Sequence, residues 1–161
     1  MKAFLNRLND ILNSVEYKEY IKKIEFYEKD REFCRHDFNH FTDLARIAYI
    51  RVLENRLPYD KEIVYTIAFL HDIGRVLEYE KNIPHHKGSV IIARELLLKS
   101  NFSSLEIKLI LDCIENHREG GELDLAKIIY ESDKLSRNCF SCKAINKCYW
   151  DEEKKNKFIR Y

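Results

Sequence analysis

Apolar side chains recur every three or four positions along almost the whole chain, which is the spacing of α-helices that bury one face. The alternation of apolar and polar residues that marks half-buried strands gives no convincing match. We therefore expect an all-α fold with five to seven helices around one core. The pattern places helices at about residues 2–13, 16–32, 37–55, 60–72, 84–99, 103–117 and 124–137.

Residues that begin and end helices occur near these boundaries. Asp60 is a suitable N-cap for the fourth helix, and Ser103 with Glu106 has the sequence of a capping box. Gly74 can end the fourth helix. The chain has only 4 glycines and 2 prolines, too few for the many tight turns of a β-sandwich or barrel. No linker-like segment interrupts it, so we expect a single domain over residues 1–161.

Charge and composition narrow the class of protein. The net charge of +1 gives no general case for nucleic-acid or membrane binding. The amino-terminal segment MKAFLNRLNDILNS is interrupted by Arg7, Asn9 and Asp10, so it lacks the continuous apolar run of a signal peptide or a membrane span. We therefore expect a cytoplasmic protein. In that compartment the 5 cysteines are more readily thiols or metal ligands than disulfides.

Several histidines and one aspartate extend the apolar faces of the predicted helices. His40 precedes Leu44 and Ile47 by four and seven positions, so it shares their buried face. His85 is turned about 100° from His86 by the helix period and falls on a mixed face. A buried carboxylate is costly without a partner, and a divalent cation shared with imidazoles is a suitable one. The residues predicted on buried faces are His40, His71, His86, His117 and Asp133.

Five short segments of the chain together carry a family resemblance. They are HFTDLARIA from His40, FLHDIGR from Phe69, HHKGSVIIARELL from His85, CIENH from Cys113 and IIYESDKLSR from Ile128. In this order they resemble the HD-domain superfamily of metal-dependent phosphohydrolases, and most of all its small stand-alone bacterial members. The resemblance covers about residues 33–138 and leaves residues 139–161 as a C-terminal extension. It implies an all-α bundle, in agreement with the helical pattern.

The resemblance also implies a metal site. By it, a first divalent ion is held by His40, His71, Asp72 and Asp133. Asp72 can bridge to a second ion, for which His86 (or His85) and His117 match the extra histidines of two-metal members. Such ligands suit Mn²⁺, Fe²⁺, Co²⁺, Ni²⁺ or Zn²⁺ better than Mg²⁺. The Gly-Tyr-Pro signature of the cyclic-dinucleotide branch does not occur in the sequence, so that activity is disfavoured.

With such a site we expect a hydrolase. Metal-activated water would attack phosphorus in a small phosphate ester, and a nucleotide is the first choice of substrate. His71 and Asp72 carry the catalytic role together with Arg75, which follows the metal-binding turn. Arg75 and Lys87 rank first for substrate contact, and His36 is expected to have a non-ligand role. The full set of candidate substrate contacts is Arg75, Lys87, His85, Arg118 and Lys134.

Two other classes of function stay open. The bundle could bind a nucleotide without turning it over, as a regulatory module. Alternatively, the protein could sense a metal or the redox state through its cysteines. Neither nucleic acid nor a membrane is expected as a partner.

The C-terminal extension contains a C-x₂-C-x₅-C arrangement at Cys139, Cys142 and Cys148. A closed zinc site needs four ligands, so a fourth must come from elsewhere. Cys34 lies six residues before His40, and Cys139 lies six residues after Asp133. If the two helices are antiparallel, both cysteines lie on the same side of the metal. We therefore predict a structural site at these four cysteines. Zinc is the first choice, an iron–sulfur cluster is the rival, and free thiols are the alternative.

Overall fold

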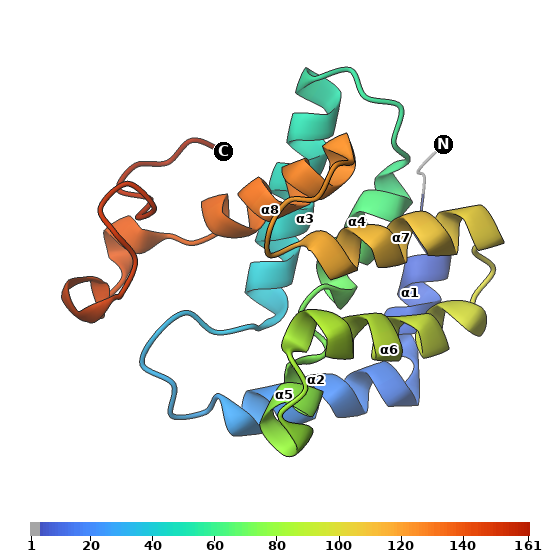
Figure 1. Ribbon diagram of the computed structural model, residues 1–161, viewed down its shortest axis with the longest axis horizontal. Helices are drawn as coiled ribbons and strands as arrows, with labels where there is room; N and C mark the ends of the chain where they lie inside the picture. The colour runs from blue at the N-terminus through green and yellow to red at the C-terminus, as the bar shows by residue number, and fades with distance from the viewer. Residues whose placement is uncertain (1–3) are drawn as a thin grey trace.

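Helices make up the regular structure of the protein. The computed structural model describes residues 4–161, so the predicted start of the first helix near Lys2 lies outside the described part. No strand occurs in residues 4–161, and the all-α prediction is confirmed. Eight α-helices occur in this part: α1 Asn6–Asn13, α2 Val15–Tyr27, α3 Phe38–Glu54, α4 Lys61–Leu70, α5 Arg75–Lys81, α6 His85–Leu98, α7 Ser104–Asn116 and α8 Asp124–Leu135 (Figure 1).

The predicted caps of α4 and α7 are present. The Asp60 side chain accepts the N–H of Glu62, which satisfies a free donor at the start of α4. Ser103 and Glu106 form a complete capping box at the start of α7. The charged helix α2 ends at Tyr27, earlier than predicted, and an irregular connection follows.

The apolar pattern missed α5, a helix of 7 residues that directly follows the His-Asp turn. Gly74 is predicted to end α4, but α4 ends at Leu70, and the φ of Gly74 is −70°, outside the left-handed region of a glycine cap. The requirement for glycine is steric. A Cβ on Gly74 would lie 2.0 Å from the nitrogen of Ser89 and 2.2 Å from the carbonyl oxygen of His85. Gly74 therefore permits the close approach of α6.

The central helix of the bundle is α3, which packs against α4 and α8 (Figure 1). In turn α6 packs against α5 and α7. His40 near the start of α3 faces Asp133 near the end of α8, whereas Arg51 further along α3 reaches the carbonyl of Ile128. The two helices are therefore antiparallel, and the start of α3 and the end of α8 meet. The buried side chains of the common core include Phe41, Leu44, Ile67, Ile92 and Ile114.

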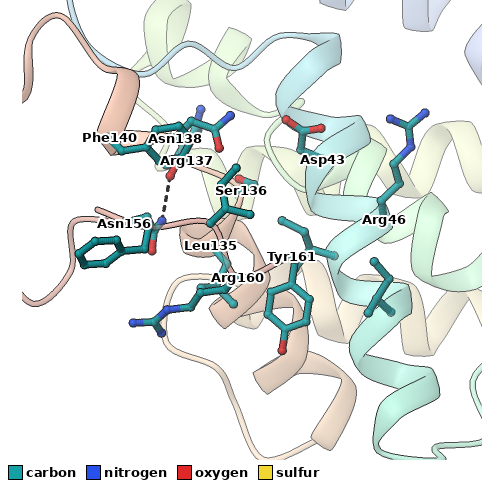
Figure 2. A pocket seen from close by; sticks show the side chains of 14 residues that line it. Asp43, Arg46, Leu135, Ser136, Arg137, Asn138, Phe140, Asn156, Arg160 and Tyr161 are labelled. Atoms are coloured by element: carbon teal, nitrogen blue, oxygen red, sulfur yellow. Dashed lines mark hydrogen bonds between the residues drawn. The ribbon is translucent and has the colours of Figure 1, made fainter.

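Beyond α8 the chain continues as an irregular segment at one edge of the bundle (Figure 1). It contains two short 3₁₀ turns, Cys139–Ser141 and Ile145–Lys147. Its last residues return to α3, where Tyr161 lines a cavity together with Asp43 and Arg46 (Figure 2). Within the described residues, none of the helices has the length and apolar content needed to span a membrane.

Candidate metal centre

Asp72 belongs to a buried polar cluster at the ends of α3, α4 and α8. Its Oδ2 lies 3.0 Å from Nε2 of His71 and 3.9 Å from Nε2 of His40. Asp133 approaches the same imidazoles, with Oδ1 3.2 Å from His40 Nε2 and 3.7 Å from His71 Nε2. Two ligand atoms that are each about 2.1 Å from one ion lie about 3.0–3.5 Å apart. This group is therefore close to the spacing of a metal site.

The other oxygen of Asp72 faces a second group of imidazoles. Oδ1 lies 3.6 Å from Nε2 of His85 and 3.8 Å from Nε2 of His117. His40, His71 and Asp72 form one buried triad that could hold an ion. Asp72, His85 and His117 form another. A carboxylate with one oxygen toward each triad is placed to bridge two ions.

Each imidazole around Asp72 has its outer nitrogen, Nδ1, held by a partner. A carbonyl, hydroxyl or carboxylate oxygen there accepts the Nδ1 hydrogen, so Nε2 faces Asp72 and offers its lone pair when the ring is neutral. Nε2 of His40 and Nε2 of His71 are buried without an aligned hydrogen-bond partner among the described residues. Histidines that bind metals are held in this way, so these residues fit a divalent ion. The Nδ1 partners are Ala68 O for His71 (2.6 Å), Ile114 O for His117 (2.6 Å), Ser136 Oγ for His40 (3.0 Å), Glu78 Oε1 for His85 (3.2 Å) and Glu28 Oε1 for His36 (2.6 Å).

Two of the histidines occupy the same position at the ends of helices. His71 is the C-cap of α4, and His117 is the C-cap of α7. Each ring donates from Nδ1 to the carbonyl oxygen three residues earlier, in the last turn of the helix, where carbonyls lack the usual N–H four residues on. The hydroxyl of Tyr17 donates to the next carbonyl of α4, that of Phe69, at 3.2 Å. The same hydrogen bond that satisfies the helix end therefore aims Nε2 into the cluster.

The structure reverses the predicted orientation of His85 and His86. His85 is 8% exposed and begins the buried face of α6, which continues through Gly88 and Ser89. His86 is partly exposed and lies outside both triads, so its predicted place on the core face is wrong. The reason is that α6 meets the His-Asp turn backbone to backbone, where the N–H of Gly74 donates to Ser89 Oγ at 2.8 Å. At the start of α6, where it meets this turn, the buried face is formed by His85 and the small residues Gly88 and Ser89.

Burial and two carboxylates set the charges of the cluster. Burial opposes a charge on His71, but Asp72 and Asp133 outweigh it and raise the pKa of His71 to about 10. Burial lowers the pKa of His40 to about 4 and that of His117 to about 3. Burial would raise the pKa of both aspartates. The charges of Arg75 and His71 nevertheless hold the pKa of Asp72, and hydrogen bonds from His40 and His71 hold the pKa of Asp133, well below the usual range. The buried carboxylate of Asp72 and the partly buried one of Asp133, beside mostly neutral imidazoles, favour a divalent cation.

A cavity of about 240 Å³ opens onto this cluster. Its walls include Arg75, Arg118 and Lys134, which are predicted substrate contacts, whereas Lys87 is exposed and lies outside the lining. Arg75 is already engaged, because its Nε donates to Asp72 Oδ1 at 3.2 Å. Cations in this number can hold the oxygens of a phosphate. The cations that line the cavity are Arg31, Arg75, Arg118, Lys134 and Arg137.

The C-terminal extension forms part of the wall of the same cavity. Cys34 also lines a second cavity of about 240 Å³, together with Cys139 and Cys142. The structure thus brings Cys34 to the cysteines of the extension, while Cys113 is buried in α7. The wall of the metal-centre cavity includes Phe33, Cys34, Cys148, Tyr149 and Trp150.

Sequence reasoning missed Glu28, Arg31 and Arg137. The carboxylate of Glu28 is buried, yet hydrogen bonds from His36 lower its pKa to about 2. This contact turns His36 inward, so that its Nε2 lies 3.7 Å from Asp72 Oδ2. Nothing local marks Glu28, which follows α2 within a run of charged residues. The one sequence signal for this contact is His36 itself, which lies just before α3 and one turn before His40.

The chain is similar to a known protein family. The chain matches the family model of the HD domain over residues 37–138, which is more than half of its length. The chain belongs to the HD-domain family. HD domains bind divalent metals and form a superfamily of metal-dependent phosphohydrolases. The HD domain begins at the N-cap of α3 and ends just after α8, so the extension with three of the cysteines lies outside it.

Several known proteins are similar to this chain. An uncharacterised protein of Clostridium beijerinckii is 46% identical over 157 residues, which cover 98% of this chain and 100% of that protein. Ribonuclease Y of Mycoplasma mycoides subsp. mycoides is 28% identical and that of Mycoplasma capricolum subsp. capricolum is 27% identical, each over 131 residues. These matches cover 80% of this chain but 23% of each ribonuclease, so the chain spans about a quarter of their length. No solved structure matches the chain.

Proposed function

We propose that this HD-domain protein is a two-metal phosphohydrolase that cleaves a phosphate ester of a nucleotide or a similar small molecule. The observation that carries the proposal is the two-sided position of Asp72. One oxygen faces His40 and His71, and the other faces His85 and His117. An isolated structural ion would need only one of these groups. Two ions joined by one carboxylate are the usual means of binding and cleaving a phosphate ester.

The protein side of the chemistry follows from the residues around Asp72. Divalent ions held there would activate water at neutral pH and offset the negative charge of a phosphoryl group. Asp133 adds a fourth ligand to the first triad, and His36 is a further ligand of the same ion in this proposal. Arg75 is a positioning residue, since its guanidinium holds Asp72 Oδ1. Mn²⁺, Fe²⁺, Co²⁺, Ni²⁺ and Zn²⁺ suit these mixed donors better than Mg²⁺.

The walls of the cavity support a nucleotide as the substrate. Arg31, Arg118 and Arg137 offer guanidinium groups to a phosphate beside the metal centre. Tyr149 and Trp150 add aromatic rings to the same cavity, and Tyr149 is 84% exposed. A nucleotide carries both a phosphate for the cations and a flat base for the rings.

A phosphatase screen tests the proposal. The panel consists of nucleoside mono-, di- and triphosphates, dinucleoside polyphosphates and phosphosugars, each with Mn²⁺, Co²⁺, Ni²⁺ or Fe²⁺. We expect turnover of at least one nucleotide that depends on the added ion. The Asp72→Ala protein serves as the control and should lack both bound metal and activity. Full activity in this variant would contradict the proposal.

The similarity to ribonuclease Y favours one second candidate, hydrolysis of phosphodiester bonds in RNA. The same screen separates the two when it includes a single-stranded oligoribonucleotide. Faster cleavage of the oligonucleotide than of any mononucleotide would favour the second candidate. Tight binding of a nucleotide without turnover, with every ion, would instead identify a regulatory module.

A further inference from the structure

Four cysteines line neighbouring cavities outside the metal centre of the HD domain. Cys34 shares one cavity with Cys139 and Cys142 and shares the metal-centre cavity with Cys148. None of the described cysteines forms a disulfide. Burial raises the pKa of the Cys34 thiol, and the nearby Cys139, Cys142 and Cys148 raise it further, whereas Arg137 opposes them. Residues more than a hundred positions apart in the chain thus meet around Cys34.

The backbone supports this convergence. Each 3₁₀ turn of the extension ends at a cysteine, because Cys142 N–H donates to Cys139 O and Cys148 N–H donates to Ile145 O. On the opposite side, Arg31 donates to the carbonyl of Cys34 at 2.8 Å. Cys34 and the tight turns are therefore each fixed by local hydrogen bonds.

Further bonds tie the extension to the bundle. Arg137 donates from Nη1 to the carbonyl of Arg35 at 2.6 Å, which joins the end of α8 to the connection before α3. The Asn156 side-chain amide donates to the carbonyl of Arg137 at 2.9 Å (Figure 2). The Phe140 N–H donates to the carbonyl of Asn156 at 3.0 Å. These bonds hold the extension to the end of α8 and to the connection before α3.

The extension contains almost no hydrophobic core of its own. In residues 139–161 only Cys139 and Ala144 are buried, while Phe140 is 47% exposed and Phe158 is 78% exposed. Segments this short, with so little buried apolar surface, usually depend on disulfides or a structural metal. A metal bound by the cysteines would therefore be the most suitable cross-link between the extension and the bundle.

We propose that Cys34, Cys139, Cys142 and Cys148 form a tetrathiolate metal centre that anchors the C-terminal extension against the cavity of the HD domain. Its occupant is zinc or an iron–sulfur cluster, both of which accept four thiolates. Arg137 and Lys155 lie close enough to the cysteines to offset part of the negative charge of such a centre. The centre does not depend on phosphohydrolase activity, but its effect on the substrate does.

The proposed thiolate centre lies beside two aromatic residues of the metal-centre cavity. Tyr149 and Trp150 directly follow Cys148, and all three line the metal-centre cavity. When the thiolates hold a metal, the two aromatic rings are fixed at the place where a substrate enters. Loss of that metal frees the rings. The substrate should then bind more weakly, while the residues around Asp72 stay in place.

Metal analysis of the full chain purified without air tests the centre. We expect either about one zinc per chain at the cysteines, or about four irons and four sulfides with a broad visible absorption band. Serine at any one of the four cysteines should remove this metal, whereas Cys113→Ala should retain it. The Asp72→Ala chain should lose the metal of the HD domain and keep that of the cysteines, which separates this proposal from the proposed function. Equal metal content in the four serine variants and the unchanged chain would overturn the centre.

Trp150 is the one tryptophan of the chain and reports on the anchoring. Removal of the thiolate-bound metal should shift its fluorescence to longer wavelength and expose residues 143–157 to trypsin. Cys148→Ser should raise KM for the substrate at least about threefold, with kcat changed less than about twofold. Unchanged fluorescence and unchanged proteolysis after loss of the metal would overturn the anchoring role.

Discussion

Glu28 accepts the Nδ1 hydrogen of His36 at 2.6 Å, and both side chains are buried. The other oxygen of Glu28 accepts the backbone N–H of His36 at 2.8 Å, and the hydroxyl of Tyr79 donates to Oε1 at 2.8 Å. The carboxylate therefore fixes the tautomer of the ring and directs its Nε2 lone pair toward Asp72. A glutamate at the end of α2 thus controls the donor atom of a histidine in the metal centre.

Replacing that carboxylate should weaken metal binding. Glu28→Gln removes the charge that holds the Nδ1 hydrogen, and we expect about 10- to 100-fold lower metal affinity. Tyr79→Phe removes one hydrogen bond to the same oxygen and leaves the charge, so its effect should be less than about threefold. Titration of the metal-free proteins with Co²⁺, followed by visible absorption, measures both. Equal affinity of Glu28→Gln and the unchanged protein would show that His36 does not serve the centre.

The two-sided position of Asp72 predicts a difference in metal stoichiometry among variants. Asp72→Ala should lower the metal content of the HD domain from about two ions to none, because both triads lose a ligand. His117→Ala should lower it to about one, since only the second triad is affected, and His40→Ala should do the same for the first. Elemental analysis after dialysis measures these values in a background of Cys139→Ser, which removes the proposed thiolate metal. A single ion in the parent chain would rule out the bridging role.

The sequence predicted the metal centre where its residues continue an apolar helical face. His71 and His117 follow buried aliphatic positions at helical spacing, and His40 precedes such positions, so the helical period alone turned the three histidines toward the core. The pattern failed at α6, where contact with the turn is made by backbone. Hydrophobicity does not mark Gly88 and Ser89 as buried, although they are the face that brings His85 into the cluster.

Residues that act across long sequence distances left no local signal. The pairing of Glu28 with His36 depends on how the connection after α2 returns to the core, and helical period carries no information about an irregular segment. The cations Arg31 and Arg137 reach the cavity from such segments as well. Position relative to a motif was no better guide, because Lys87 adjoins His86 and still lies outside the cavity.

Gly74 should tolerate no side chain. The Cβ of Gly74→Ala would lie 2.0 Å from the backbone nitrogen of Ser89, and rigid backbone cannot move aside as a side chain can. We expect a loss of about 3 kcal/mol in the free energy of unfolding, which lowers the Tm by roughly 10 °C. Lys87 lies near Ser89 in α6 but is exposed, so Lys87→Ala should shift the Tm by less than about 2 °C. A melting temperature for Gly74→Ala equal to that of the Lys87→Ala control would contradict this role of the glycine.

The raised pKa of His71 predicts opposite effects of pH on the metal-free and metal-loaded proteins. In the metal-free protein this pKa is about 10, against an ordinary value of 6.5, so protonation stabilises the fold below pH 6.5 and the benefit is lost as pH rises toward 10. The Tm of the chelator-treated protein should therefore fall over this interval. A metal requires neutral His71, so binding releases a proton and the affinity should rise about tenfold per pH unit over the same interval. Metal affinity that stays constant from about pH 7 to pH 9 would show that no proton is displaced.

Arg118 and Lys87 form a matched pair for the phosphate site. Each follows a histidine at one end of a helix and is exposed, but only Arg118 lines the cavity. Arg118→Ala should raise KM for a phosphorylated substrate about three- to tenfold with little change in kcat, because it removes a partly solvated charge from the phosphate. The ratio of the KM of Arg118→Ala to that of the unchanged protein should become smaller in high salt, where exposed charges are screened. Lys87→Ala should leave KM within about twofold of the unchanged protein. Equal changes in the two variants would mean that the general positive charge of this surface, and not the wall of the cavity, attracts the substrate.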